Sequence, residues 1–289
     1  MKDLKITDVR IHPGDSSFLI DDGETAVLYD TGFGFTGGAL AEKLKGILGE
    51  RSLDFLFLSH SHYDHVLGSV AVAEMFPGAE IVAGEYTAEI FRREGALRKM
   101  RELDEKFAAK CGIADYRFTG DRLRVDRTVK EGDVFTAGKM RFCVVELPGH
   151  TRCSIGYYLE ETGLLLAAET LGVYDGTDTI VPSFLVSVKQ TLESIDKVLQ
   201  MDVKRLVIPH YGLLTEEETD FFLKNMRDSA AQAADFLAER IRRGMTTEEI
   251  VEDFKNTYRK QYMSAVYPED AVNLNTSIMV EVVRREYGL

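Results

Sequence analysis

Residues 55–68 read FLFLSHSHYDHVLG, and this stretch decides how the rest of the chain is interpreted. Its four apolar residues predict a short buried strand. The polar run that follows holds three histidines and one aspartate within six positions. Such a cluster is costly to bury, and its imidazoles repel one another when protonated. Both costs are removed when the side chains bind a metal cation. The stretch therefore predicts a metal site at the end of a strand.

The spacing within this cluster suits two metal ions. Just past the end of a strand, His60 and His62 can converge on one cation while Asp64 and His65 turn toward another. Imidazole nitrogens and a carboxylate are ligands for zinc, iron or manganese. A centre of this kind needs more nitrogen ligands than the stretch offers, so we expect later parts of the chain to supply them.

Two later histidines also follow predicted strands. They are His150, within Pro148-Gly149-His150, and His210, within Pro209-His210. Five of the six histidines thus lie at strand ends, and only His12 is left over. Satisfied core or surface histidines would explain any one of these positions, but five in this arrangement favour a metal centre.

Composition limits the function classes. With 289 residues, 45% of them apolar, the chain can bury a large core as one domain, or as one domain with an extension. A formal charge of -13 disfavours binding to nucleic acid. We expect a soluble protein that is not exported, because no long apolar run appears. Three cysteines without CxxC spacing predict buried, reduced thiols and a cytoplasmic location.

Apolar periodicity and turn signals predict strands and helices over residues 4–208. The expected strands are a β-meander over 4–31, then 54–59, 81–83, 122–125, 133–136, 140–147, 154–159, 164–168 and 205–208. The expected helices are one at about 40–48, then 66–76, the charged segment 86–111 with its narrow apolar stripe, and one that begins at Ser187.

After His210 the apolar period is helical to the end of the sequence. Capping boxes are expected where Glu follows Thr by three residues, at Thr215 and at Thr246, and Pro268 begins a last helix. We therefore predict a main domain over 1–213, with a charged helical insertion at about 86–112. A helical extension over 214–289 would need that domain to cover its apolar faces.

These motifs resemble, in their order, those of the metallo-β-lactamase superfamily. The resemblance spans roughly residues 5–212 and includes Asp30-Thr31-Gly32. The other motifs that carry it are His60-x-His62-x-Asp64-His65, Pro148-Gly149-His150-Thr151, Glu169 after the apolar run 164–168, and Pro209-His210. The resemblance implies an α+β fold, the four-layer αβ/βα sandwich, with its metals at one edge.

The resemblance also implies two divalent transition metal ions and a ligand set for each. Zinc is the first expectation, and iron and manganese stay open. The first metal would take His60, His62 and His150, the second would take Asp64, His65 and His210, and the Glu169 carboxylate would bridge them.

Glu169 departs from the family pattern. Most dinuclear members have a Gly-Asp pair where this chain has Ala168-Glu169, which is one methylene longer. A glutamate can still bridge if the strand sits slightly farther back, or it can bind one metal only. The alternative is an exposed acid at a strand end, where Glu is common.

The resemblance implies a dinuclear hydrolase that uses a metal-bound hydroxide on a small ester, thioester, lactone or phosphodiester. Asp64 would be catalytic by accepting a hydrogen bond from that hydroxide. Asp30 either orients the ligand loop or forms a simple turn. Tyr63 and Tyr211 either line the pocket or serve packing.

The sequence lacks features that some subclasses of the superfamily require. No cysteine occupies a ligand position, as one subclass of β-lactamases requires. Oxygen-reducing diiron members carry Glu where this chain has His62 and add a flavin domain, and nuclease members bring an extra domain and a basic surface.

The two helical segments leave alternatives open. The segment 86–111 and the extension would roof a site for a small-molecule substrate, or form a homodimer interface. The extension resembles that of a quinolone-signal response thioesterase in the superfamily, which suggests a metal-binding regulatory or interaction protein with incidental hydrolysis. The third alternative is a degenerate, metal-free sandwich.

Overall fold

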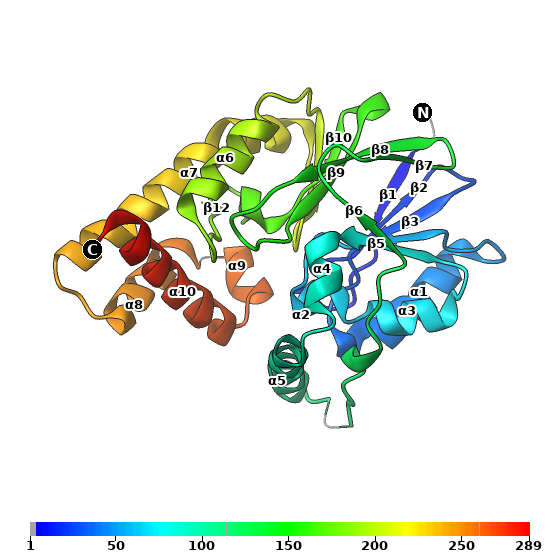
Figure 1. Cartoon of the computed structure of the whole chain (residues 1–289), viewed down its shortest axis with the longest axis horizontal. Coiled ribbons are helices and arrows are strands. Elements are labelled where there is room, and N and C mark those ends of the chain that lie inside the picture. Colours follow the sequence, from blue (N-terminus) through cyan, green and yellow to red (C-terminus); the bar gives the residue numbers. More distant parts are fainter. Residues whose placement is uncertain (1–3, 114, 260) are drawn as a thin grey trace. The chain divides into compact units, whose positions relative to one another are not determined.

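A computed structural model of the chain describes residues 4–113, 115–259 and 261–289. Its elements are labelled in Figure 1. By their internal packing the residues form two compact units, 1–145 with 155–162, and 146–154 with 163–289. Each unit has its own hydrophobic core. The predicted division at residue 213 stays a prediction.

The first unit is built on a six-stranded sheet in the order β1-β2-β3-β4-β5-β6. The strands are β1 (Lys5–Asp8), β2 (Phe18–Asp21), β3 (Ala26–Tyr29), β4 (Phe55–Phe57), β5 (Glu80–Gly84) and β6 (Arg127–Val129). The first three form the predicted antiparallel meander, and β3 to β6 run parallel. Because parallel neighbours end at the same edge, Asp30 after β3 lies beside Ser59 after β4.

Helices connect the parallel strands of this sheet, as crossovers require. They are α1 (Gly37–Leu48), α2 (Tyr63–Val66), α3 (Ser69–Met75), α4 (Glu85–Ile90) and α5 (Glu94–Lys110). The predicted helix at 86–111 is thus present as two helices, of which α5 buries Met100, Asp104 and Ala108. Cys111 is exposed, so the expectation of three buried cysteines is wrong, and only Cys153 is buried.

Three further strands of the first unit, in the order β7-β8-β9, place aromatic rings against the main sheet. They are β7 (Val134–Ala137), β8 (Met140–Glu146) and β9 (Ile155–Leu159). The Phe57 ring lies 5.0 Å from Phe142 and stacks on Tyr157 at 4.5 Å between centroids. The Tyr157 hydroxyl donates to the carbonyls of Leu58 and Val82, each at 3.1 Å. β9 therefore anchors the strand that leads to His60.

The second unit combines short strands with five helices. Its strands are β10 (Leu164–Leu166), β11 (Val173–Tyr174), β12 (Ile180–Val181), β13 (Arg205–Ile208) and β14 (Gly212–Leu213). Its helices are α6 (Val188–Val198), α7 (Glu216–Arg242), α8 (Thr247–Tyr258), α9 (Gln261–Val266) and α10 (Glu269–Tyr287). β10 pairs parallel with β13, and β13 pairs antiparallel with β14. The carboxyl ends of β10 and β13 consequently meet at one edge.

Helices α7, α8 and α10 share one apolar core. α10 packs on α7 and α8 (Figure 1), with Leu237, Phe254, Met279 and Val283 buried among them. Both capping boxes, at Thr215 and at Thr246, are present as predicted, and α10 begins after Pro268. In the described ranges, no helix combines the length and hydropathy that a bilayer crossing requires.

Two predicted elements are wrong in detail. Residues 122–125 form no strand, and a 3-10 turn (Gly120–Arg122) precedes β6. Leu123 and Val125 give the alternating apolar pattern because their side chains pack on the core, but their backbone does not pair with a strand. The helix predicted over 66–76 is divided at Gly68. There the backbone lies against Thr31, and a Cβ on Gly68 would sit 2.0 Å from the Thr31 carbonyl oxygen.

We expect Tyr157→Phe to lower the free energy of unfolding by about 1–2 kcal/mol, because two buried carbonyls lose their shared donor. Chemical denaturation measures the change. Tyr86→Phe is the matched control, since the Tyr86 hydroxyl only meets Arg93 at the surface, at 3.1 Å. Equal stability losses in the two variants would contradict the anchoring role.

Asp104 predicts a pH-dependent stability. Burial raises the pKa of this carboxyl from 3.8 to about 7, although the Gly34 N–H donates to it at 3.2 Å. Because the folded pKa is raised, the contribution of Asp104 to stability falls as the pH rises from about 4 to about 7. We expect Asp104→Asn to stabilise the metal-free protein by about 2–4 kcal/mol at pH 8 and little at pH 4.

Denaturation at both pH values checks this expectation. Glu94→Gln, an exposed acid at the start of the same helix, controls for the change in net charge. A stabilisation by Asp104→Asn that is equal at pH 4 and pH 8 would be incompatible with it.

Candidate metal centre

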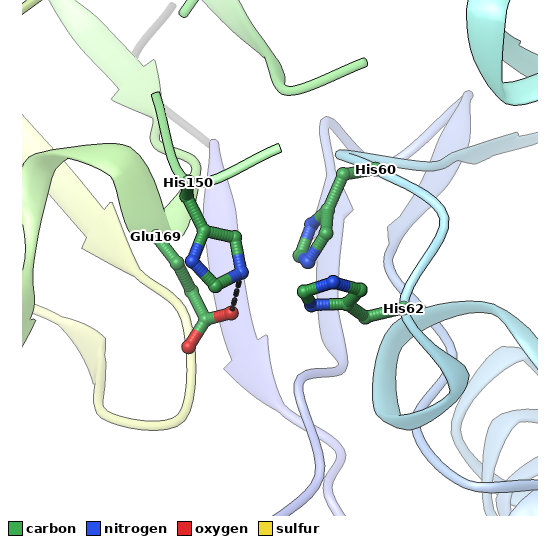
Figure 2. Close-up of side chains that lie close together, drawn as sticks. All are labelled: His60, His62, His150 and Glu169. Carbon is green, nitrogen blue, oxygen red and sulfur yellow. Dashed lines mark ion pairs between the residues drawn. The ribbon is translucent and has the colours of Figure 1, made fainter. Parts of the chain in front are cut away.

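The first unit brings four of the predicted ligands together directly after β4. The His60 and His62 rings lie 4.6 Å apart (Figure 2), and the His60 and His65 rings 4.1 Å apart, between centroids. His60 and His65 are fully buried, whereas His62 and Asp64 are partly exposed. Asp64 and His65 belong to α2, and one donor atom of each lies within 4.8 Å of the other's.

Asp30 holds this ligand loop from inside the fold. One carboxylate oxygen accepts from Nδ1 of His65 at 2.7 Å and from the Ser59 hydroxyl at 2.8 Å. The other accepts from the Ser59 backbone N–H at 2.8 Å. Asp30 is fully buried and has a positive φ of 54°. Of the two roles expected for Asp30, this geometry supports the orienting one, because a simple turn former is exposed.

These contacts also determine which nitrogen of each histidine can meet a cation. Ser59 gives its single hydroxyl proton to Asp30, so Nδ1 of His60, 2.9 Å from the same hydroxyl oxygen, is the donor in that contact. Nδ1 of His65 likewise donates to Asp30. In both rings Nε2 then carries the lone pair that a metal ion takes.

The second unit brings together the other three predicted ligands. Nε2 of His150 lies 2.8 Å from one carboxylate oxygen of Glu169 (Figure 2), and Nε2 of His210 lies 3.3 Å from the other. Glu169 is 3% exposed, so the alternative of an exposed strand-end acid is wrong. Burial opposes its ionisation, but the charges of His150 and His210 lower the pKa of Glu169 well below its usual range.

The loop that carries His150 is fixed by close backbone packing. Gly149 has φ 139°, and a Cβ there would lie 2.7 Å from the Thr191 backbone in α6. The Ser194 hydroxyl donates to the Pro148 carbonyl at 2.7 Å. Glycine is therefore required at 149, and α6 determines where His150 emerges.

Two residues that the sequence did not identify orient His150. Its Nδ1 lies 2.9 Å from both the carbonyl and the hydroxyl of Ser183, and its backbone N–H donates to the Thr170 hydroxyl at 3.3 Å. Thr170 in turn donates to the Leu147 carbonyl at 2.6 Å. Neither residue belongs to a pattern that marks a metal site, so no sequence signal could have found them.

Two tyrosines of the helical C-terminal segment also touch the ligands. The Tyr267 hydroxyl donates to Glu169, and the Tyr262 hydroxyl donates to the His210 carbonyl at 2.5 Å. His210 itself has a positive φ of 62°. Helical periodicity, the pattern that predicts this segment, carries no information on a polar contact with a distant strand end.

The tyrosines that flank the ligands in sequence have structural contacts. The Tyr211 hydroxyl donates to Glu218 at 2.6 Å, at the start of α7. The Tyr63 ring lies 5.6 Å from the Phe33 ring. These contacts favour the packing role for both.

The donors in each unit fit a transition metal. Each unit supplies two or more imidazoles and at least one carboxylate, the set that zinc, iron and manganese take in proteins. Several of the imidazoles are oriented through Nδ1 by a carboxylate, a hydroxyl or a carbonyl, as is usual for metal-binding histidines. A buried carboxylate between two Nε2 atoms suits a shared cation.

Comparison with known proteins identifies the fold. A family model described as the metallo-beta-lactamase superfamily matches residues 14–210. A metallo-beta-lactamase family protein from Thermus thermophilus is similar in structure, with a TM-score of 0.68, 18% identity, and coverage of 100% of this chain and 95% of that one. The predicted fold class is confirmed.

Other similar proteins differ in what they do. The sec-alkylsulfatase Pisa1 from Pseudomonas sp. has a TM-score of 0.66 at 15% identity, and the match covers all of this chain and 50% of that one. A hydroxyacylglutathione hydrolase from Brucella ovis is 32% identical over 120 residues, which are 42% of this chain and 34% of the relative. The match thus spans about a third of the length of this curated relative.

We expect Asp30→Asn to weaken metal binding by roughly 10–100-fold, as loss of such an outer hydrogen bond does. Asparagine tolerates the positive φ, but its amide NH₂ replaces an oxygen that accepts from His65 and Ser59. Competition with a chromophoric chelator measures the affinity. Asp54→Asn is the control, because Asp54 only accepts from the Ala26 N–H, at 2.8 Å. Unchanged affinity in Asp30→Asn would show that Asp30 does not orient a ligand.

Proposed function

Because the chain belongs to the metallo-beta-lactamase superfamily, we propose that it is a metal-dependent hydrolase whose two groups of ligands form one dinuclear centre. The proposed ligands are His60, His62 and His150 for one cation, Asp64, His65 and His210 for the other, and Glu169 as the bridge. Zinc is the first expectation for both positions.

The observation that carries the proposal is the position of Glu169 between two imidazoles. Its two carboxylate oxygens lie 2.8 and 3.3 Å from Nε2 of His150 and of His210, which are assigned to different cations. A carboxylate in that position can give one oxygen to each. The extra methylene of glutamate is accommodated because β10 ends at Leu166 and Glu169 begins a 3-10 turn (Glu169–Leu171).

Each residue has a distinct part in hydrolysis. The bound cations would lower the pKa of a water molecule toward neutrality and polarise the group under attack. Asp64, partly exposed on α2, would accept a hydrogen bond from the attacking water and keep its lone pair aimed at the substrate. Asp30 and Ser183 would hold their histidines in the required tautomer.

A small thioester is the substrate class we favour among esters, thioesters, lactones and phosphodiesters. The support is the similarity to proteins named hydroxyacylglutathione hydrolase, in which an acyl group is removed from glutathione. The net charge of -13 disfavours nucleic-acid substrates. The cytoplasmic location and the homodimer stay predictions.

Elemental analysis together with a substrate panel tests the function. We expect about two transition-metal equivalents per chain in protein prepared without chelator, and turnover of at least one ester or thioester that a chelator abolishes. Stoichiometric metal without turnover of any class would overturn the hydrolase and favour a regulatory protein. Absence of metal would overturn the centre.

Glu169→Ala tests the bridge. We expect the variant to retain about one metal equivalent and to lose roughly 100-fold or more in kcat/KM, because one ligand of each cation is removed. Glu161→Ala, an exposed acid a few residues earlier, is the matched control. Two equivalents in Glu169→Ala would remove this residue from the centre.

A further inference from the structure

The second unit holds a small cavity, partly open to solvent, between the β11–β12 strands and the C-terminal helices. Its volume is about 40 Å³, and Val181, Phe254, Val272 and Met279 contribute to an apolar wall. Phe254 belongs to α8, whereas Val272 and Met279 belong to α10. No residue of the lining, within the part of the chain that the structure describes, carries a formal charge.

The cavity shares two wall residues with the candidate metal centre. Tyr267 lines it and donates its hydroxyl proton to Glu169. Ser183 lines it and contacts Nδ1 of His150 at 2.9 Å. A group that enters the cavity therefore lies one side chain away from two proposed ligands, His150 and Glu169.

The volume limits what the cavity can accept. A void of about 10–15 Å³ on this measure holds one water molecule, so 40 Å³ admits about three groups of that size. That is the size of a short alkyl chain. The uncharged lining disfavours a carboxylate or an ammonium group, because neither would find a counter-charge there.

We propose that this cavity is the subsite for the short aliphatic acyl chain of the substrate, an inference that rests on the hydrolase function proposed above. The acyl carbonyl would lie at the metal centre and the alkyl chain would point between α8 and α10. Water adds its oxygen to the acyl carbon, the bond from that carbon to sulfur breaks, and the thiol leaves with a proton. The subsite takes no part in this bond exchange and determines which acyl chain is accepted.

The first test is the dependence of kcat/KM on acyl-chain length in a thioester series from acetyl to octanoyl. We expect an optimum near butanoyl, with a rise of roughly fourfold per methylene before it. Val272→Phe should lower kcat/KM for the butanoyl thioester by about tenfold or more relative to kcat/KM for the acetyl thioester, because the ring fills the cavity. Val272→Ala should move the optimum toward hexanoyl.

Leu274→Phe is the matched control, since Leu274 lies on the same helix and is 38% exposed. It should keep the wild-type profile. Thermal unfolding shows whether Val272→Phe and Val272→Ala are folded. The two variants are expected to shift the preferred acyl-chain length in opposite directions, so the test does not depend on either variant alone.

The second readout does not depend on turnover. Met263 and Met279 line the cavity, so their ¹³C-methyl NMR signals should shift when butanamide, a neutral probe, is added to wild-type protein or to Leu274→Phe. The shifts should be lost in Val272→Phe. Turnover with a profile that is flat or unaffected by Val272→Phe would overturn the subsite. Probe binding without turnover of any substrate class would instead overturn the hydrolase function.

Discussion

The buried carboxylate of Asp30 is the constraint on which the first group of ligands depends. It accepts hydrogen bonds from both the backbone and the side chain of Ser59 and from His65, and so joins the ends of β3 and β4 to α2. A buried charge is tolerated only when such bonds satisfy it. Asp30 and His210 are, among the described residues, the two that have a positive φ without being glycine. Both follow strands close to the proposed metal centre, and strained backbone is expected to concentrate at functional sites.

The proposed ligands could be identified in the sequence because each follows a local pattern. A polar residue directly after an apolar run lies at a strand end whatever the rest of the fold does, which identifies His60, His150 and His210 without tertiary information. The capping boxes were predictable for the same reason. Ser183 and Tyr267 were not, because their contacts depend on segments 33 and 98 residues away in the chain. Likewise, the break at Gly68 depends on the carbonyl of Thr31, and no helical periodicity encodes that contact.

Glu169 departs from the family pattern, and its surroundings are compatible with the ligand role proposed for it. The sequence suggested that a longer side chain needs a backbone set farther back, and the short 3-10 turn after β10 begins at this residue. The charges of His150 and His210 lower the pKa of Glu169 although the residue is buried. This electrostatic environment is consistent with the ligand role. A carboxylate that stays ionised there can serve as a ligand at neutral pH.

The contacts of Tyr262 and Tyr267 have a consequence for how this chain is compared with its relatives. The family match ends at residue 210, and these tyrosines lie beyond it while touching His210 and Glu169. The end of the family match at residue 210 thus separates the proposed ligands from residues that contact them. Exchanging the C-terminal segment between related proteins would also exchange the hydrogen-bond donor to the Glu169 carboxylate. Chimeras joined at this boundary would therefore not be modular, and divergence in the C-terminal segment could change the surroundings of the proposed centre without altering a proposed ligand.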